Sequence, residues 1–197
     1  MLYPLLFETS LFPIVWGGTR LRQMKGMPPS NEPIGESWEV STLDMLPSVV
    51  ANGTWAGYPL REVIGKMPDA ILGKAVAKKY QNDMPLLVKL IDTKADLSVQ
   101  VHPDDTMALR EHNASGKTEM WYIMEADEGA GIYLGFKENV TKEQFQKAIE
   151  EKTLMELLNF YPVKAGECYF IPSGTLHAIG AGCLICEIQQ NSNLTYR

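Results

Sequence analysis

The chain has 197 residues, of which 45% are hydrophobic and 21% charged, and its formal net charge is −6. A domain of this size and composition can bury a core of its own, and the negative charge argues against DNA or RNA as the main partner. No apolar run approaches the ~20 residues that span a membrane. Residues 1–12 lack the pattern of a targeting segment, and the three cysteines form no disulfide framework, so a cytoplasmic location is expected.

The N-terminal half combines irregular segments, short helices and strands. Proline and glycine are frequent in residues 1–50, which indicates irregular structure with short strands. Apolar residues recur at helical spacing over about residues 58–80, with Pro68 separating two pieces. Residues 85–92 form an apolar run of strand length. Residues 97–102 alternate between apolar and polar side chains and are predicted to form a second strand.

The C-terminal half is predicted to be mostly strands. A short helix is expected over residues 104–111 and a strand over 118–124. A capping-box pair followed by an apolar stripe predicts the clearest helix over residues 141–158. Residues 166–197 return to strands separated by glycine-rich turns. The pattern predicts one mainly β domain over residues 1–197, a β-sandwich or jelly roll with inserted α-helices.

The first candidate site lies on the expected strand over residues 97–102. Side chains two residues apart point to the same face of a strand, so Ser98, Gln100 and His102 share one face. An amide and an imidazole on one face are typical of a metal site. Taken alone, however, this segment fits an ordinary half-exposed strand with a polar face better.

The second candidate site is His177. A lone histidine in a strand is usually structural, but here Gly166, Pro172, Gly174 and His177 follow the spacing G-x5-P-x-G-x2-H. This spacing matches the second signature of the cupin superfamily of metal-binding jelly rolls. The match is incomplete, because the full signature ends with asparagine where this chain has Ala181.

The chain also departs from the first cupin signature, which carries His-x-His and a nearby glutamate. Here Gln100-Val101-His102 stands in its place, and the nearest suitable carboxylate is Glu119. Together with the following stretches, this departure resembles the type I mannose-6-phosphate isomerase family in its short bacterial form: Trp16–Gly18, Ile34–Glu39, Leu87–Asp92, Leu97–Asp105, Lys117–Trp121, Ile171–Ala178 and Glu187–Ser192. The resemblance extends over the whole chain.

The resemblance implies one zinc ion per chain. It implies that the ligands are Gln100, His102, Glu119 and His177. Two imidazoles and a carboxylate are a common zinc set when one position stays open for water or substrate. The same two histidines and carboxylate would suit non-haem iron equally well, so the residues alone do not identify the metal.

The resemblance further implies interconversion of mannose 6-phosphate and fructose 6-phosphate through an enediol. Lys89, Lys117 and Arg197 match positions that the family places near the site, and Arg197 matches its catalytic arginine. Ser98, Lys117 and Arg197 are the expected contacts to the sugar phosphate. Lys89 could instead lie on a solvated strand face. The general base is not identified; carboxylates, lysines and a metal-bound water are all open.

Members of this family usually continue past the arginine into a second β-rich domain, which this chain is expected to lack. Arg197 would then be a mobile terminal residue, and an exposed sheet edge would invite self-association, so a monomer or a weak homo-oligomer is expected. Two alternative functions therefore stay open: an inactive or regulatory sugar-binding cupin, and an iron-dependent cupin oxygenase. Cys183 and Cys186 are interpreted as free thiols and His112 as a loop residue.

Overall fold

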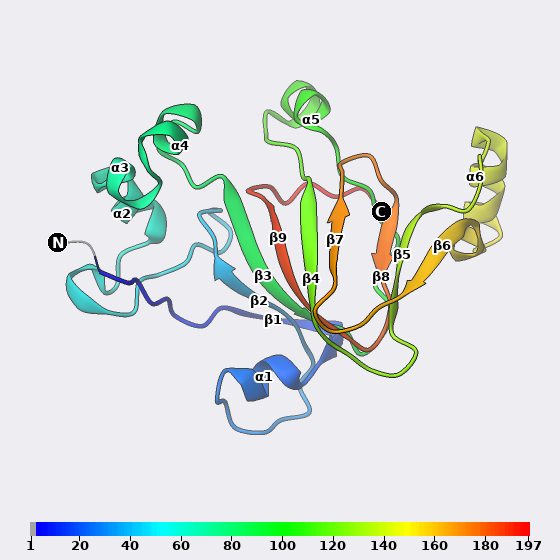
Figure 1. The fold of residues 1–197 in the computed structure, drawn as a ribbon, viewed down its shortest axis with the longest axis horizontal. Helices are drawn as coiled ribbons and strands as arrows, with labels where there is room; N and C mark the ends of the chain where they lie inside the picture. Colours follow the sequence, from blue (N-terminus) through cyan, green and yellow to red (C-terminus); the bar gives the residue numbers. More distant parts are fainter. Residues whose placement is uncertain (1–2) are drawn as a thin grey trace.

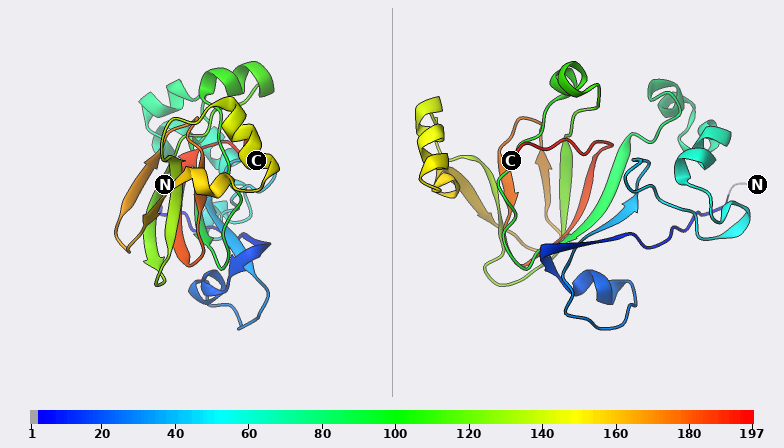
Figure 2. Two further views of the ribbon diagram at one scale, coloured as in Figure 1. Left: turned by 90° about the vertical axis from the view of Figure 1, so that its right-hand side faces the viewer. Right: turned by 180° about the vertical axis from the view of Figure 1, so that it is seen from behind.

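A computed structural model describes residues 3–197. Residues 1 and 2, which belong to the segment 1–12 discussed above as lacking a targeting pattern, lie outside the described part. The prediction of a mainly β fold is confirmed: two antiparallel sheets make up the body of the molecule (Figure 1). Figures 1 and 2 show helix α6 beyond the small sheet and helices α2 to α4 at the opposite end of the molecule. Within residues 3–197, no helix is both long and apolar enough to cross a membrane.

The larger sheet has six strands, all paired antiparallel. Their spatial order is β1 (Leu11–Gly18), β2 (Ile34–Val40), β3 (Leu86–Asp92), β9 (Cys183–Gln190), β4 (Glu119–Ala126) and β7 (Cys168–Ile171). Strand β9, last in the sequence, lies at the centre between β3 and β4. Its register sets Lys89 of β3 and Trp121 of β4 directly beside Glu187. These side chains therefore lie on one face of the sheet.

The smaller sheet has three strands, in the order β6 (Leu158–Pro162), β5 (Gly131–Phe136) and β8 (His177–Ile179). Its buried Ile132 and Ile179 belong to the same hydrophobic cluster as Trp121 and Ile185 of the larger sheet. The two sheets therefore share one core, as expected for a jelly roll.

Short helices occupy the connections. The region 58–80 contains α2 (Leu60–Lys66), α3 (Pro68–Ile71) and α4 (Lys74–Lys79), and α5 spans Asp105–His112. The region 1–50 also contains a short helix that the sequence did not suggest, α1 (Arg20–Met24), and single 3-10 turns lie at η1 (Gly53–Trp55) and η2 (Leu154–Leu157).

The helix expected over residues 141–158 is shorter than predicted. Helix α6 covers only Lys142–Glu150, and its predicted capping box between Thr141 and Gln144 is present. The helix ends because Lys152 adopts a left-handed conformation with φ 59°. The apolar residues that suggested a longer helix belong to η2 and to the start of β6.

The prediction of a regular strand over residues 97–102 is wrong. This segment is extended but forms only isolated bridges. Gln100 pairs with His177, and the next residue, Val101, pairs with Tyr196 of the C-terminal segment (residues 191–197). The backbone N–H of Leu97 also donates to Ile179 O at 2.9 Å. The segment therefore bridges β8 and the C-terminal segment, which places His102 next to both.

Candidate metal centre

Three predicted ligands meet in the interior. His102, Glu119 and His177 each present one ligand atom, and these atoms lie within 4.8 Å of one another. All three side chains are buried. His102 is the last residue of the bridging segment, Glu119 begins β4 and His177 begins β8, so the cluster joins the two sheets.

Backbone carbonyls orient both imidazoles. His102 Nδ1 lies 2.9 Å from Leu194 O, and His177 Nδ1 lies 2.8 Å from Thr175 O. A carbonyl oxygen can only accept a hydrogen bond, so each Nδ1 carries the proton and donates it. Each Nε2 then keeps its lone pair and faces Glu119, at 3.4 Å for His102 and 3.3 Å for His177. This is the arrangement that a metal-binding histidine needs.

A hydrogen bond joins the turn before His177, which belongs to the second sequence signature, to His102 in the segment that corresponds to the first. Gly174 has φ 82°, a conformation that favours glycine. In this position its N–H donates to His102 O at 2.8 Å. The proline- and glycine-containing turn before His177 thus fixes the backbone of His102 as well. This contact explains how two signatures so far apart in the sequence build one site.

The cluster fits a cation. Glu119 Oε1 and His177 Nε2 are buried and make no hydrogen bond within residues 3–197, whereas Glu119 Oε2 lies 2.9 Å from the Lys117 ammonium. A buried polar atom without a partner costs about 1–3 kcal/mol. A metal ion bound by these atoms would remove that penalty, and two imidazoles with one carboxylate suit zinc. The donor set alone suits iron equally well.

The protonation states also favour metal binding. Burial opposes ionisation of Glu119, but the charged surroundings, among them the Lys117 ammonium, outweigh it and hold the pKa of this carboxyl well below its ordinary value. Burial lowers the pKa of His102 despite the adjacent carboxylate. At neutral pH the site therefore offers an anionic carboxylate and a neutral His102, the forms that bind metal.

Lys117 is a buried cation at the edge of this cluster. Its Nζ lies 2.9 Å from Glu119 Oε2 and 3.1 Å from His102 Nε2. Burial alone would lower the pKa of Lys117, but the carboxylates of Glu187 and Glu119 raise it. The side chain therefore keeps its positive charge in an enclosed place.

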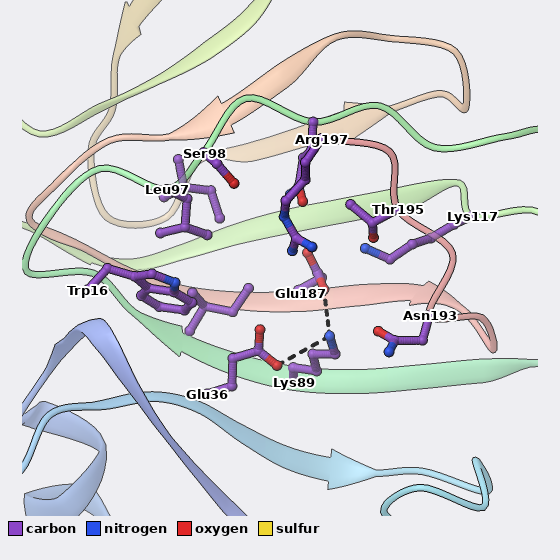
Figure 3. A pocket seen from close by; sticks show the side chains of 13 residues that line it. Trp16, Glu36, Lys89, Leu97, Ser98, Lys117, Glu187, Asn193, Thr195 and Arg197 are labelled. Carbon is purple, nitrogen blue, oxygen red and sulfur yellow. Dashed lines mark ion pairs between the residues drawn. The ribbon is translucent and has the colours of Figure 1, made fainter.

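A pocket of about 150 Å³ adjoins the cluster (Figure 3). Its lining includes every further residue that the sequence suggested for the site: Lys89, Ser98, Gln100, Lys117 and Arg197. Lys89 is only 4% exposed, so the interpretation of a solvated strand face is wrong. The Gln100 side chain lines the pocket, while its backbone pairs with His177.

The floor of the pocket holds a buried charge network. Lys89 Nζ lies 3.3 Å from Glu36 Oε2 and 3.8 Å from Glu187 Oε1. Trp121 Nε1 donates to the other oxygen of Glu187 at 2.9 Å. Burial, with a smaller contribution from the nearby Glu119 charge, raises the pKa of Glu187. Figure 3 shows Lys89 between the two carboxylates.

Sequence reasoning missed Glu36, Glu187, Asn193 and Thr195, which also line the pocket. A signal for Glu187 was present in the sequence. It shares a strand face with Ile185 and Gln189 in an otherwise apolar run, and a charge in such a place needs a partner. The other residues carried no comparable signal, because loops and distant strands bring them to the pocket.

The C-terminal segment forms one wall. Asn193, Thr195 and Arg197 line the pocket at every second position, and Figure 3 shows the Arg197 side chain extending into its middle. The segment is anchored at Tyr196, whose N–H and carbonyl both form 3.0 Å hydrogen bonds with Val101. Arg197 was expected to be a mobile terminal residue, but the preceding residue is fixed by this backbone pair.

Comparison with known proteins gives the family. Residues 6–130, more than half of the chain, match the family model described as "Phosphomannose isomerase type I, catalytic domain". The chain belongs to the type I phosphomannose isomerases. The matched range contains Gln100, His102 and Glu119, whereas His177 lies beyond it. The resemblance stated from the motifs is thereby confirmed.

Individual phosphomannose isomerases are similar to this chain in sequence and in fold. The chain is 41% identical over its full length to "Mannose-6-phosphate isomerase" of Streptococcus mutans. The crystal structure of the Bacillus subtilis mannose 6-phosphate isomerase superposes over 98% of this chain, with a TM-score of 0.88 and 37% identity. A mannose 6-phosphate isomerase solved with bound zinc and yttrium shares the fold over 97% of this chain, with a TM-score of 0.74 and 20% identity.

The chain spans about 60% of the length of the first two of these relatives and 69% of the third. The described part of this chain contains the His102–Glu119–His177 cluster and the adjoining pocket.

Proposed function

We propose that this chain carries the active site of an isomerase that interconverts mannose 6-phosphate and fructose 6-phosphate through an enediol. The observation that carries the proposal is the buried His102–Glu119–His177 cluster beside a pocket lined by three cationic side chains. The Streptococcus mutans relative, named for this reaction, supports the choice of substrate.

Zinc is the proposed metal, held by His102, Glu119, His177 and the amide oxygen of Gln100. A related isomerase was solved with zinc, which supports zinc over iron. Bound zinc would act as a Lewis acid that stabilises negative charge developing on a substrate oxygen.

Arg197 is the proposed partner of the substrate's phosphate. Lys89 and Lys117 are already paired with buried carboxylates, whereas no ion pair joins Arg197 to another residue of the described chain, 3–197. A guanidinium matches phosphate in a bidentate manner, and the hydroxyls of Ser98 and Thr195 lie in the same lining. The phosphate end of the sugar would then lie beside the C-terminal segment.

Lys89 and Lys117 would act at the reacting end. Isomerisation places negative charge on the oxygens at C1 and C2, and fixed cations in an enclosed site stabilise that charge. Lys117 lies next to the metal ligands and Lys89 lies in the network on the pocket floor. Both side chains are held by ion pairs, so little reorganisation is needed.

Glu187 is the proposed proton carrier between C2 and C1. The reaction needs a group that takes a proton from one carbon and returns it to the neighbouring one. Glu187 lines the pocket, and Trp121 holds one of its oxygens while the other faces Lys89. Its raised pKa favours accepting the proton. Glu187→Gln, which keeps the shape, should abolish turnover and leave zinc content unchanged.

The decisive experiment is a coupled assay of fructose 6-phosphate formation from mannose 6-phosphate by this chain with zinc supplied. Turnover that chelation abolishes and zinc restores would support the isomerase. Binding of zinc and sugar phosphate without turnover would instead identify a sugar-binding module, and activity that resists chelation would contradict the metal role. Metal analysis that found stoichiometric iron in place of zinc would favour the oxygenase.

A further inference from the structure

The sequence interpretation of His112 as a loop residue is wrong: it is the last residue of α5. Its Nε2 lies 2.6 Å from the hydroxyl oxygen of Tyr196, and the two ring centroids lie 5.9 Å apart. The residues are far apart in the sequence, and Tyr196 directly precedes Arg197. Nothing in the family motifs pointed to this contact.

Along the C-terminal segment, residues that line the pocket alternate with residues that attach the segment to the rest of the protein. Asn193, Thr195 and Arg197 line the pocket. The intervening residues point elsewhere and hold the segment: Leu194 O accepts the hydrogen bond from His102 Nδ1, and Tyr196 pairs with Val101 through its backbone and with His112 through its side chain. Of these three attachments, only the last joins two side chains. It can therefore be removed without touching a metal ligand.

Helix α5 is a fixed support for this contact. The helix starts just after His102 and Pro103, and its capping residue Asp104 accepts from Met107 N at 2.7 Å. The loop beyond it returns to the same place, since Lys117 N donates to Pro103 O at 3.0 Å. The helix thus belongs to the stretch of chain that connects His102 to Lys117, and both of these residues belong to the site.

We propose that His112 and Tyr196 form a positioning pair that holds Arg197 over the pocket. Arg197 is exposed and has no ion-pair partner in the described chain (residues 3–197), so the fixed position of the neighbouring Tyr196 helps to hold it in place. The backbone pairing with Val101 fixes the main chain of Tyr196. The contact with His112 fixes its ring and completes the attachment. This proposal rests on the assignment of Arg197 to the phosphate under the proposed function.

The pair should affect binding of the phosphate end more than the chemistry. Loss of one hydrogen bond of this kind corresponds to an affinity change of about 2- to 12-fold. Tyr196→Phe, which removes only the hydroxyl, should therefore raise KM for mannose 6-phosphate about 2- to 12-fold with little change in kcat. His112→Ala should do the same, and the double variant should equal either single variant, because both remove one contact.

The experiment measures KM, kcat, zinc content and the hydrogen-exchange rate of the Tyr196 amide in the full chain. Binding of inorganic phosphate by calorimetry adds a readout that needs no turnover. Tyr161→Phe serves as the matched control, because Tyr161 is an exposed tyrosine on β6. His112→Gln, which retains a polar side chain, should recover part of the lost affinity.

Coupled losses of substrate or phosphate affinity, with faster exchange at Tyr196, would support the pair. Additive effects, or single variants that match the Tyr161→Phe control in every readout, would overturn it. Loss of zinc in Tyr196→Phe would also overturn it, because the residue would then act through His102. If the unmodified chain shows no turnover, the proposed function fails, but phosphate binding and amide exchange still test the pair.

Discussion

Replacing Glu119 by glutamine removes the only negative charge at the centre of the cluster and keeps the shape of the side chain. Glu119 is 1% exposed and its Oε2 lies 2.9 Å from the Lys117 ammonium, which is itself buried. Removing one partner of a buried ion pair destabilises a protein by about 3–5 kcal/mol. The Glu187 carboxylate also attracts Lys117, so the expected loss in the metal-free protein is near the lower figure, about 3 kcal/mol.

Urea unfolding in the presence of chelator measures this loss without any contribution from metal. Glu111→Gln is the matched control, because it makes the same chemical change in an exposed pair, with Arg110 Nη2 and Glu111 Oε1 2.7 Å apart. Exposed pairs contribute about 0–1 kcal/mol. The reasoning is refuted if Glu119→Gln costs no more than Glu111→Gln. Zinc should then widen the gap between the two variants, because metal stabilises only a protein that binds it.

Three further predictions concern the same site. His102→Ala and His177→Ala should each lose zinc, as measured by metal analysis of the purified protein; stoichiometric zinc in both variants would exclude them as ligands. Lys117→Ala should reduce turnover more than zinc content, and an unaltered rate would remove Lys117 from the reaction. The pKa of His102 is lowered in the folded state. At pH values near and below the ordinary histidine pKa of about 6.5, the unfolded chain therefore binds more protons than the folded protein. Unfolding free energy of the metal-free protein should therefore fall as pH drops from 7 towards 5.5, and His102→Gln should weaken that dependence.

The sequence predicted the parts of the site that depend on local spacing. Gly174 and His177 belong to one turn, and Gln100 and His102 lie two residues apart in an extended segment, so their relative positions follow from backbone geometry. This holds even though residues 97–102 do not form a regular strand. An extended backbone is enough to set the side-chain directions.

The parts that depend on strand order could not be predicted. Glu187 lies between Lys89 and Trp121 only because β9, the last strand, is inserted between β3 and β4. No spacing along the chain encodes that insertion. The contact between His112 and Tyr196 is of the same kind, since it depends on how the C-terminal segment, which pairs with Val101, meets the end of α5.

The charges of the site are matched to the two ligands of the proposed function, a divalent metal ion and a sugar phosphate. The cations of Lys89, Lys117 and Arg197 are balanced in number by carboxylates of Glu36, Glu119 and Glu187. A divalent metal ion would therefore leave an excess of two positive charges in an enclosed pocket. A phosphate monoester, which carries about −1.5 to −2 at pH 7, compensates that excess. Each ligand should accordingly raise the affinity of the other by the same factor, and equal zinc affinity with and without mannose 6-phosphate would show that the two do not share this site.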